Sequence, residues 1–94
     1  ERRDLLAAQR GDDEPALQVR IGQNPDDLDA RLQLASQLVQ RQAYEAALEH
    51  LLEIVRRDRA FGDDIGRRKM LAVFEMADAD TVSDYRRRLS AALY

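Results

Sequence analysis

Residues 24–61, NPDDLDARLQLASQLVQRQAYEAALEHLLEIVRRDRAF, decide the fold of this chain. Asn24-Pro25 opens the stretch, a stripe of Leu and Ala follows, and a second apolar stripe begins at Tyr44. About 34 residues separate the opening from the Arg-Asp-Arg segment at its end, a period typical of repeated helix pairs. Stacked helix pairs form extended binding surfaces, so the stretch indicates a scaffold and not a catalyst.

The pattern of apolar residues predicts helices throughout. They recur at intervals of three and four, and no segment shows the sustained alternation expected of a strand. We therefore predict an all-α fold, a repeat-like array of about six helices in three antiparallel hairpins. The helices are expected over about 2–9, from Asp12 or Asp13 to Gly22, over about 26–41, 44–57 and 63–77, and from Thr81 nearly to the C-terminus.

Polar residues mark where several of these helices should begin. Asp12 or Asp13 is expected to cap the second helix, and Asp63-Asp64 to begin the fifth. Thr81, with Asp84 three residues on, resembles a capping box for the last helix. The inner faces of the last two helices are expected to carry Met70, Leu71, Phe74 and Ala77, and then Val82, Tyr85, Leu89, Ala92 and Leu93.

Composition excludes several classes of function. The chain has 94 residues, a formal net charge of −3, no cysteine and one histidine. It can hold no disulfide or thiolate metal site, and His50 has no second ligand at a metal-binding spacing. No apolar run approaches the roughly 20 residues that span a bilayer. We expect one domain over residues 1–94, in the cytoplasm, with no cofactor, no enzymatic activity and no membrane contact.

Three basic clusters raise the question of nucleic acid binding. They are Arg56-Arg57 with Arg59, Arg67-Arg68-Lys69 and Arg86-Arg87-Arg88. Two of them fall near helix C-termini, where cations offset the helix dipole. Only five aromatic residues are present, too few to suggest a stacking surface for RNA. We therefore expect solvated helix ends and no nucleic acid partner.

Particular residues give the third and fourth helices a resemblance to the tetratricopeptide (TPR) repeat. Leu34-Ala35 stands where that repeat usually has Leu-Gly, and Tyr44 and Ala47 occupy its hairpin positions. The match departs at Gln42, where the turn usually has Gly, and at Arg59, where a Pro is usual. The resemblance implies a degenerate repeat that binds proteins.

A longer stretch resembles a narrower group, the C-terminal helical domain of bacterial thioredoxin-like co-chaperones, also called chaperedoxins. The similarity covers about residues 13–94 and rests on NPDD, on EAALEHLLEIVRRDRAFGDDIGRRKMLAVFE and on the terminal YRRRLSAALY. It implies a C-terminal fragment whose full-length protein has an N-terminal thioredoxin fold. It also implies a holdase that binds unfolded or oxidation-damaged clients and passes them to the chaperonin or the Hsp70 system.

Two surfaces are candidate binding sites. A groove beside the third helix is expected to present Asp29, Leu32, Ser36, Val39 and Gln40 to a client. The last helix is expected to present Arg86, Arg87, Leu89, Leu93 and Tyr94 to a chaperone partner. In each case the competing interpretation is ordinary packing against a neighbouring helix, because apolar residues on a helix face are usually buried.

Two other functions stay open on the sequence alone. The chain could be a generic TPR adaptor in an unrelated assembly, without holdase activity. It could also be a regulatory domain linked to an upstream catalytic or redox domain. An isolated domain could further form a homodimer through apolar surface that an upstream domain would cover.

Overall fold

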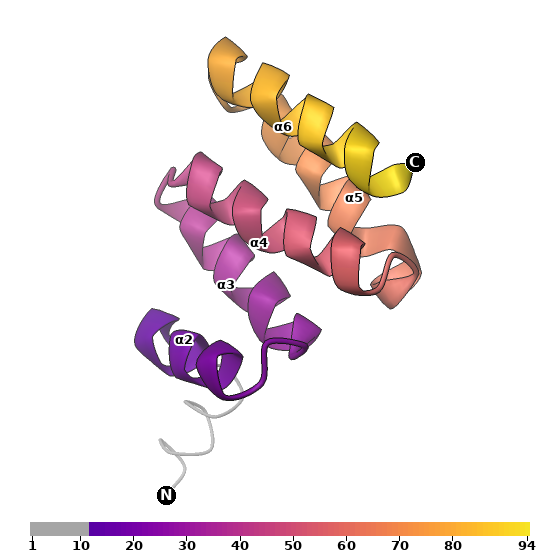
Figure 1. Cartoon of the computed structure of the whole chain (residues 1–94). Helices are drawn as coiled ribbons and strands as arrows, with labels where there is room; N and C mark the ends of the chain where they lie inside the picture. The colour runs from indigo at the N-terminus through magenta and orange to yellow at the C-terminus, as the bar shows by residue number, and fades with distance from the viewer. Residues whose placement is uncertain (1–11) are drawn as a thin grey trace, which may run out of the picture.

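The computed structural model describes residues 12–94, and within them the chain is entirely helical. The helices are α2 (Glu14–Gln23), α3 (Leu28–Gln40), α4 (Tyr44–Arg57), α5 (Phe61–Phe74) and α6 (Ala79–Leu93), as Figure 1 shows. The prediction of an all-α fold is confirmed for this part of the chain. The helix predicted over about 2–9 lies outside the described residues, so the six-helix, three-hairpin count stays a prediction.

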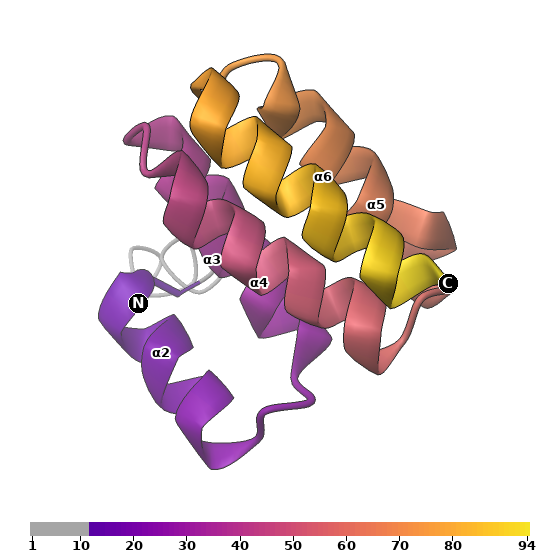
Figure 2. The same cartoon turned by 45° about the horizontal axis from the view of Figure 1, so that its top comes forward.

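Helix α4 is the centre of the array. It packs against α3 on one side and against α5 and α6 on the other, and α2 covers the far side of α3. Figures 1 and 2 show the same order from two directions, with α2 at one end and the α5/α6 pair at the other. The molecule measures 47 × 25 × 22 Å along its principal axes. Successive elements therefore stack in one direction, as in a helical repeat protein.

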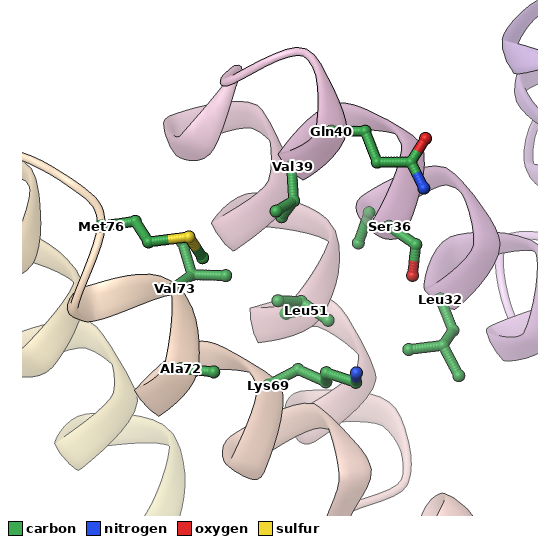
Figure 3. Close-up of a pocket in the computed structure, with 10 residues that line it drawn as sticks. Leu32, Ser36, Val39, Gln40, Leu51, Lys69, Ala72, Val73 and Met76 are labelled. Atoms are coloured by element: carbon green, nitrogen blue, oxygen red, sulfur yellow. The ribbon is translucent and has the colours of Figure 1, made fainter.

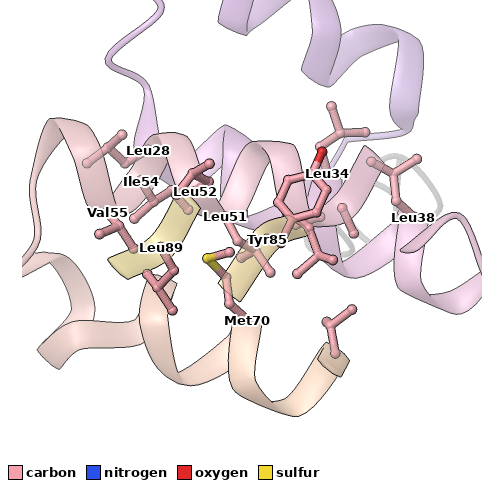
Figure 4. Packing of buried hydrophobic residues seen from close by; sticks show 14 of the residues in the cluster. Leu28, Leu34, Leu38, Leu51, Leu52, Ile54, Val55, Met70, Tyr85 and Leu89 are labelled. Carbon is pink, nitrogen blue, oxygen red and sulfur yellow. The ribbon is translucent and has the colours of Figure 1, made fainter. Parts of the chain in front are cut away.

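The core follows α4 along its length (Figure 4). One face of this helix is buried from Ala47 to Val55, and it meets Leu34 and Leu38 of α3 on one side and Met70 and Tyr85 of the α5/α6 pair on the other. The apolar stripe expected to begin at Tyr44 is confirmed, because α4 buries Ala47, Leu48, Leu51, Leu52, Ile54 and Val55. The buried apolar residues are Leu17, Leu28, Ala30, Leu34, Ala35, Leu38, Ala47, Leu48, Leu51, Leu52, Ile54, Val55, Met70, Val73, Phe74, Tyr85 and Leu89.

Aspartates cap three of the helices. Asp13 accepts a hydrogen bond from the amide of Ala16, and Asp27 accepts one from Ala30, so the predicted cap of the second helix is Asp13. The capping box predicted at Thr81 is wrong. Asp78 caps α6 instead, accepting bonds from both the amide and the hydroxyl of Thr81, and the helix begins two residues earlier than expected. An aspartate carboxylate, which is a stronger acceptor than a threonine hydroxyl, takes the cap position.

The start of α5 also differs from the prediction. The element begins at Phe61 and not at Asp63, and a left-handed turn interrupts it: Gly62, Asp63 and Asp64 have φ values of 60°, 59° and 64°. Two of the three carry a side chain, and this backbone region disfavours residues with a Cβ. The right-handed part of α5 therefore follows directly after Asp64, close to the expected start, but Asp63 and Asp64 themselves form part of the turn.

The inner face predicted for α5 is confirmed in part. Met70 and Phe74 are buried as expected, but Leu71 is exposed, and Gly66 and Val73 complete the buried face. The inner face predicted for α6 is confirmed, because Tyr85 and Leu89 are buried and Val82, Ala92 and Leu93 pack against them. This correction matters for the site, since it decides which side chains of α5 face α3.

Candidate protein-binding groove

A groove of about 270 Å³ opens between α3 and α5, with α4 as its floor. Figure 3 shows side chains of α3 along one wall, Leu51 of α4 at the bottom and side chains of α5 and the turn after it along the other wall. The wall from α3 forms because residues three and four apart along a helix share a face. The lining residues are Leu32, Ala35, Ser36, Val39, Gln40, Leu51, Lys69, Ala72, Val73 and Met76.

Four of the five residues predicted for a groove line this one: Leu32, Ser36, Val39 and Gln40. Leu32 and Val39 are only partly buried, so each covers core and still faces the groove. Asp29 does not line the groove; its carboxylate accepts a hydrogen bond from Gln33 at 2.7 Å and lies 3.7 Å from the guanidinium of Arg20 on α2. The structure thus brings four predicted residues together, and their binding of a partner stays a prediction.

The groove is mainly apolar, with a few polar groups at its edge. Lys69 is the charged member among the described lining residues, and Ser36 and Gln40 add a hydroxyl and an amide. In Figure 3 the ammonium of Lys69 extends toward Leu32 from the opposite wall. Apolar surface with a few placed polar groups is the usual composition of a site that takes peptide or ligand side chains.

The sequence analysis did not predict the wall of the groove that α5 and the turn after it supply. Lys69, Ala72, Val73 and Met76 line it, but the predicted register turned Leu71 inward in their place. The spacing of Lys69, Ala72, Val73 and Met76 at intervals of three and four was available as a signal. Gly66, where α5 lies close to Ile54 and Val55 of α4, is not an apolar side chain and so adds nothing to this periodic pattern.

The predicted C-terminal site corresponds to a second, shallower depression, of about 220 Å³. Arg86, Leu89, Leu93 and Tyr94 line it together with Leu71 of α5. Leu89 is largely buried there, whereas Tyr94 is 98% exposed. Arg87 does not line the depression, and its guanidinium pairs with Asp84 at 2.5 Å.

Most arginines of the basic clusters are held by ion pairs or by other contacts. Arg57 binds Asp26 at 2.7 Å and Glu53, four residues earlier on the same helix, at 3.0 Å. Arg67 pairs with Asp64, and Arg86 stacks over the ring of Phe74 at 5.2 Å. These exposed pairs contribute little to stability individually, but they neutralise much of the local charge.

Glu49 joins α4 to α6. Its Oε2 accepts hydrogen bonds from the hydroxyl of Tyr85 and from Arg88, the latter at 2.8 Å, and the guanidinium of Arg88 lies over the Tyr85 ring. Burial, together with the bond to Glu49, raises the pKa of the Tyr85 phenol well above its usual range. The hydroxyl therefore stays protonated and donates throughout the physiological pH range.

A buried arginine lies on the opposite side of α4. Arg31 is 7% exposed, donates through Nε to the carbonyl of Pro25 at 2.9 Å, and lies 3.4 Å through Nη1 from Nδ1 of His50. Burial, and secondarily the charge of Arg31, lowers the pKa of His50. His50 is half-buried, and nothing in the sequence pattern pointed to Arg31 as its neighbour.

The described residues offer no metal centre and no membrane span. Over residues 12–94 we find no group of three or more His, Cys, Asp or Glu side chains that could hold a metal ion. In the same part of the chain, none of the helices has the length and apolar character needed to cross a bilayer.

Comparison with known proteins identifies the family. A family model described as tetratricopeptide repeat matches residues 7–94, nearly the whole chain. No curated protein and no solved structure matches the chain significantly. Tetratricopeptide repeats generally bind proteins and are not catalysts, which agrees with a groove between α3 and α5. The chain belongs to the tetratricopeptide repeat family.

Proposed function

We propose that this chain is the client-binding domain of a cytoplasmic thioredoxin-like co-chaperone, and that unfolded or oxidation-damaged proteins place apolar side chains in the groove between α3 and α5. The observation that carries the proposal is the exposed apolar lining of this groove. Leu32 and Val39 of α3 are partly exposed, and Met76 in the turn after α5 is exposed on the facing wall.

The size of the groove supports a peptide segment as the occupant. At about 270 Å³ it is near the lower limit of small-molecule pockets, which measure about 300–1,000 Å³. It has room for a few apolar side chains of an extended chain. The lining gives no dense set of polar groups that would select one sequence, and clients that differ in sequence require this kind of tolerance.

The second part of the proposal concerns transfer of the client. The depression formed by Arg86, Leu89, Leu93 and Tyr94 lies at the opposite end of the molecule from α2. It combines apolar area with a cationic rim and suits docking of a folded chaperone partner, the chaperonin or the Hsp70 system. The resemblance of residues 85–94 to the co-chaperone family supports this assignment.

Suppression of aggregation by the purified chain tests client binding. The wild type is expected to slow the aggregation of a chemically unfolded model protein at near-stoichiometric ratios, as measured by light scattering. The double variant Leu32→Asp/Val39→Asp and the single variant Ala72→Glu should both lose this effect, because they place carboxylates in the groove. Ala72 is exposed, so Ala72→Glu removes no core residue.

Val19→Asp is the matched control. Val19 is 58% exposed on α2, away from the groove, so this variant also adds a carboxylate at an exposed apolar position. It should behave like the wild type, and circular dichroism verifies that every variant is folded. If the folded Ala72→Glu protein suppresses aggregation as well as Val19→Asp, the groove is not the client site. If the wild type has no effect at any ratio, the chain is an adaptor without holdase activity.

A further inference from the structure

The two methionines contain all of the sulfur in this chain, because the sequence has no cysteine. They lie in opposite environments. Met70 is fully buried at 0% exposure, in the core between α4, α5 and α6. Met76 is 49% exposed, in the turn after α5, and lines the groove. Any oxidant in solution therefore meets one thioether and not the other.

Met76 occupies a position where its polarity matters. In Figure 3 its thioether lies over Val73 and extends toward Val39 on the opposite wall of the groove. The side chain is thus part of the apolar surface that an incoming segment would contact. A thioether is flexible and polarizable, which suits contact with varied apolar side chains.

Oxidation would reverse this character. A peroxide transfers one oxygen atom to the sulfide, which loses two electrons and becomes a sulfoxide, while the peroxide is reduced to water or to the corresponding alcohol. The product is polar and a strong hydrogen-bond acceptor, and thiol-dependent reductases return it to the sulfide. Met76 is half exposed, so the new oxygen would be hydrated, and an apolar segment seated beside Val39 and Val73 would have to displace that water.

We propose that Met76 is a reversible oxidation site through which peroxides weaken the binding of apolar segments in the groove. The inference rests on the proposed client binding, and it assigns to the same groove a means of control. Met70 stays reduced because the folded core excludes the oxidant, so the modification changes the binding surface without unfolding the array.

The first experiment measures selectivity and does not depend on any client. The folded chain is treated with hydrogen peroxide, digested and analysed by mass spectrometry. One added oxygen is expected on the peptide that contains Met76 well before any appears on Met70. Circular dichroism and the urea unfolding midpoint should be unchanged. Equal rates at the two positions would overturn the proposal.

The second experiment measures the effect on binding. A reduced, alkylated and fluorescently labelled model protein is the probe, and fluorescence anisotropy gives its Kd for the wild type and for Met76→Leu, before and after peroxide. Oxidation should raise the wild-type Kd roughly tenfold, and a methionine sulfoxide reductase should restore it. Met76→Leu keeps an apolar side chain that peroxide does not modify, so its Kd should not change.

The outcomes separate the two proposals. Suppose that the reduced wild type and Met76→Leu both bind the probe. If peroxide then changes both affinities equally, or changes neither, the proposal that Met76 oxidation controls binding is wrong, while the proposed client binding stands. If neither reduced protein binds the probe, the proposed client site fails, and the control of binding fails with it.

Discussion

Gly66 of α5 lies so close to Val55 of α4 that an added Cβ would be 3.0 Å from the Val55 Cγ2 atom. The same Cβ would lie 3.0 Å from Ile54 Cγ2 and 3.2 Å from the carbonyl oxygen of Leu51. The glycine therefore permits the close packing of the two helices that form the floor and one wall of the groove. This accounts for a residue that is otherwise unfavourable inside a helix.

Replacing Gly66 with alanine is expected to destabilise the fold. Helix propensity alone would favour alanine by about 1 kcal/mol. The steric cost should exceed this gain, because Ile54 and Val55 are buried and the Leu51 oxygen belongs to the backbone, so none of them moves freely. We expect a net loss of about 1–2 kcal/mol in the free energy of unfolding, measured by urea denaturation.

Gly22→Ala provides the control for this measurement. Gly22 lies near the end of α2, and a Cβ there would meet nothing within 4 Å. Alanine should therefore stabilise the protein by up to about 1 kcal/mol. If Gly66→Ala stabilised the protein to the same extent, the packing of α5 against α4 would not require a residue without a side chain at position 66.

The glycine contact also explains which parts of the structure the sequence could and could not predict. The helices α3 and α4 were predicted well because their apolar residues repeat regularly and an aspartate or a turn bounds them. The α3 wall of the groove followed from the same periodicity. The burial of Met70 and Phe74 on α5 followed as well. The inward position of Val73 in place of Leu71 did not, because it depends on Gly66 fitting against Val55, a contact between residues of different helices.

Gln42 is expected to be a strained position. It lies in the turn between α3 and α4 with a φ of 64°, in the left-handed region, where the tetratricopeptide pattern usually has glycine. Its side chain is exposed. Its backbone N–H donates to the carbonyl of Val39, and glycine at this position would keep that bond. Gln42→Gly should therefore raise the free energy of unfolding by up to about 1 kcal/mol.

A glycine placed in regular helix should have the opposite effect. Ala46 is exposed within α4, so Ala46→Gly should lower stability by about 1 kcal/mol. Thermal and urea unfolding of both variants give the comparison. A loss of stability in Gln42→Gly similar to that of Ala46→Gly would show that the turn does not depend on the left-handed conformation.

Tyr85→Phe tests the connection between α4 and α6. The substitution keeps the buried ring and its contact with Arg88 but removes the donor to Glu49. Loss of a partly buried hydrogen bond to a charged group should lower the free energy of unfolding by about 1.5–3 kcal/mol. Tyr94→Phe is the control, since Tyr94 is almost fully exposed and its substitution should have no measurable effect. Equal midpoints for the two variants would contradict the proposed role of the Glu49 contact.

Arg31 illustrates a feature that sequence patterns do not reveal. An arginine in an amphipathic helix is normally assigned to the exposed face, yet Arg31 is buried beside His50. The guanidinium can only donate, so the nearby Nδ1 of His50 can serve only as an acceptor, which requires a neutral imidazole. The acidic groups that influence this pair are Glu49 and Glu53 of α4 and Asp26 before α3.

His50 should therefore make stability depend on pH in the mildly acidic range. Its pKa is lowered in the folded state, chiefly by burial and then by Arg31, from an ordinary value of 6.5. As pH falls through that value, the unfolded chain binds a proton that the folded chain resists, so the free energy of unfolding falls; the loss stops below the folded-state pKa. His50→Gln does not titrate, and its amide oxygen can still accept from Arg31. Urea midpoints measured from pH 7.5 to pH 5 should fall more steeply for the wild type than for His50→Gln, and parallel curves would mean that the folded and unfolded states protonate His50 alike.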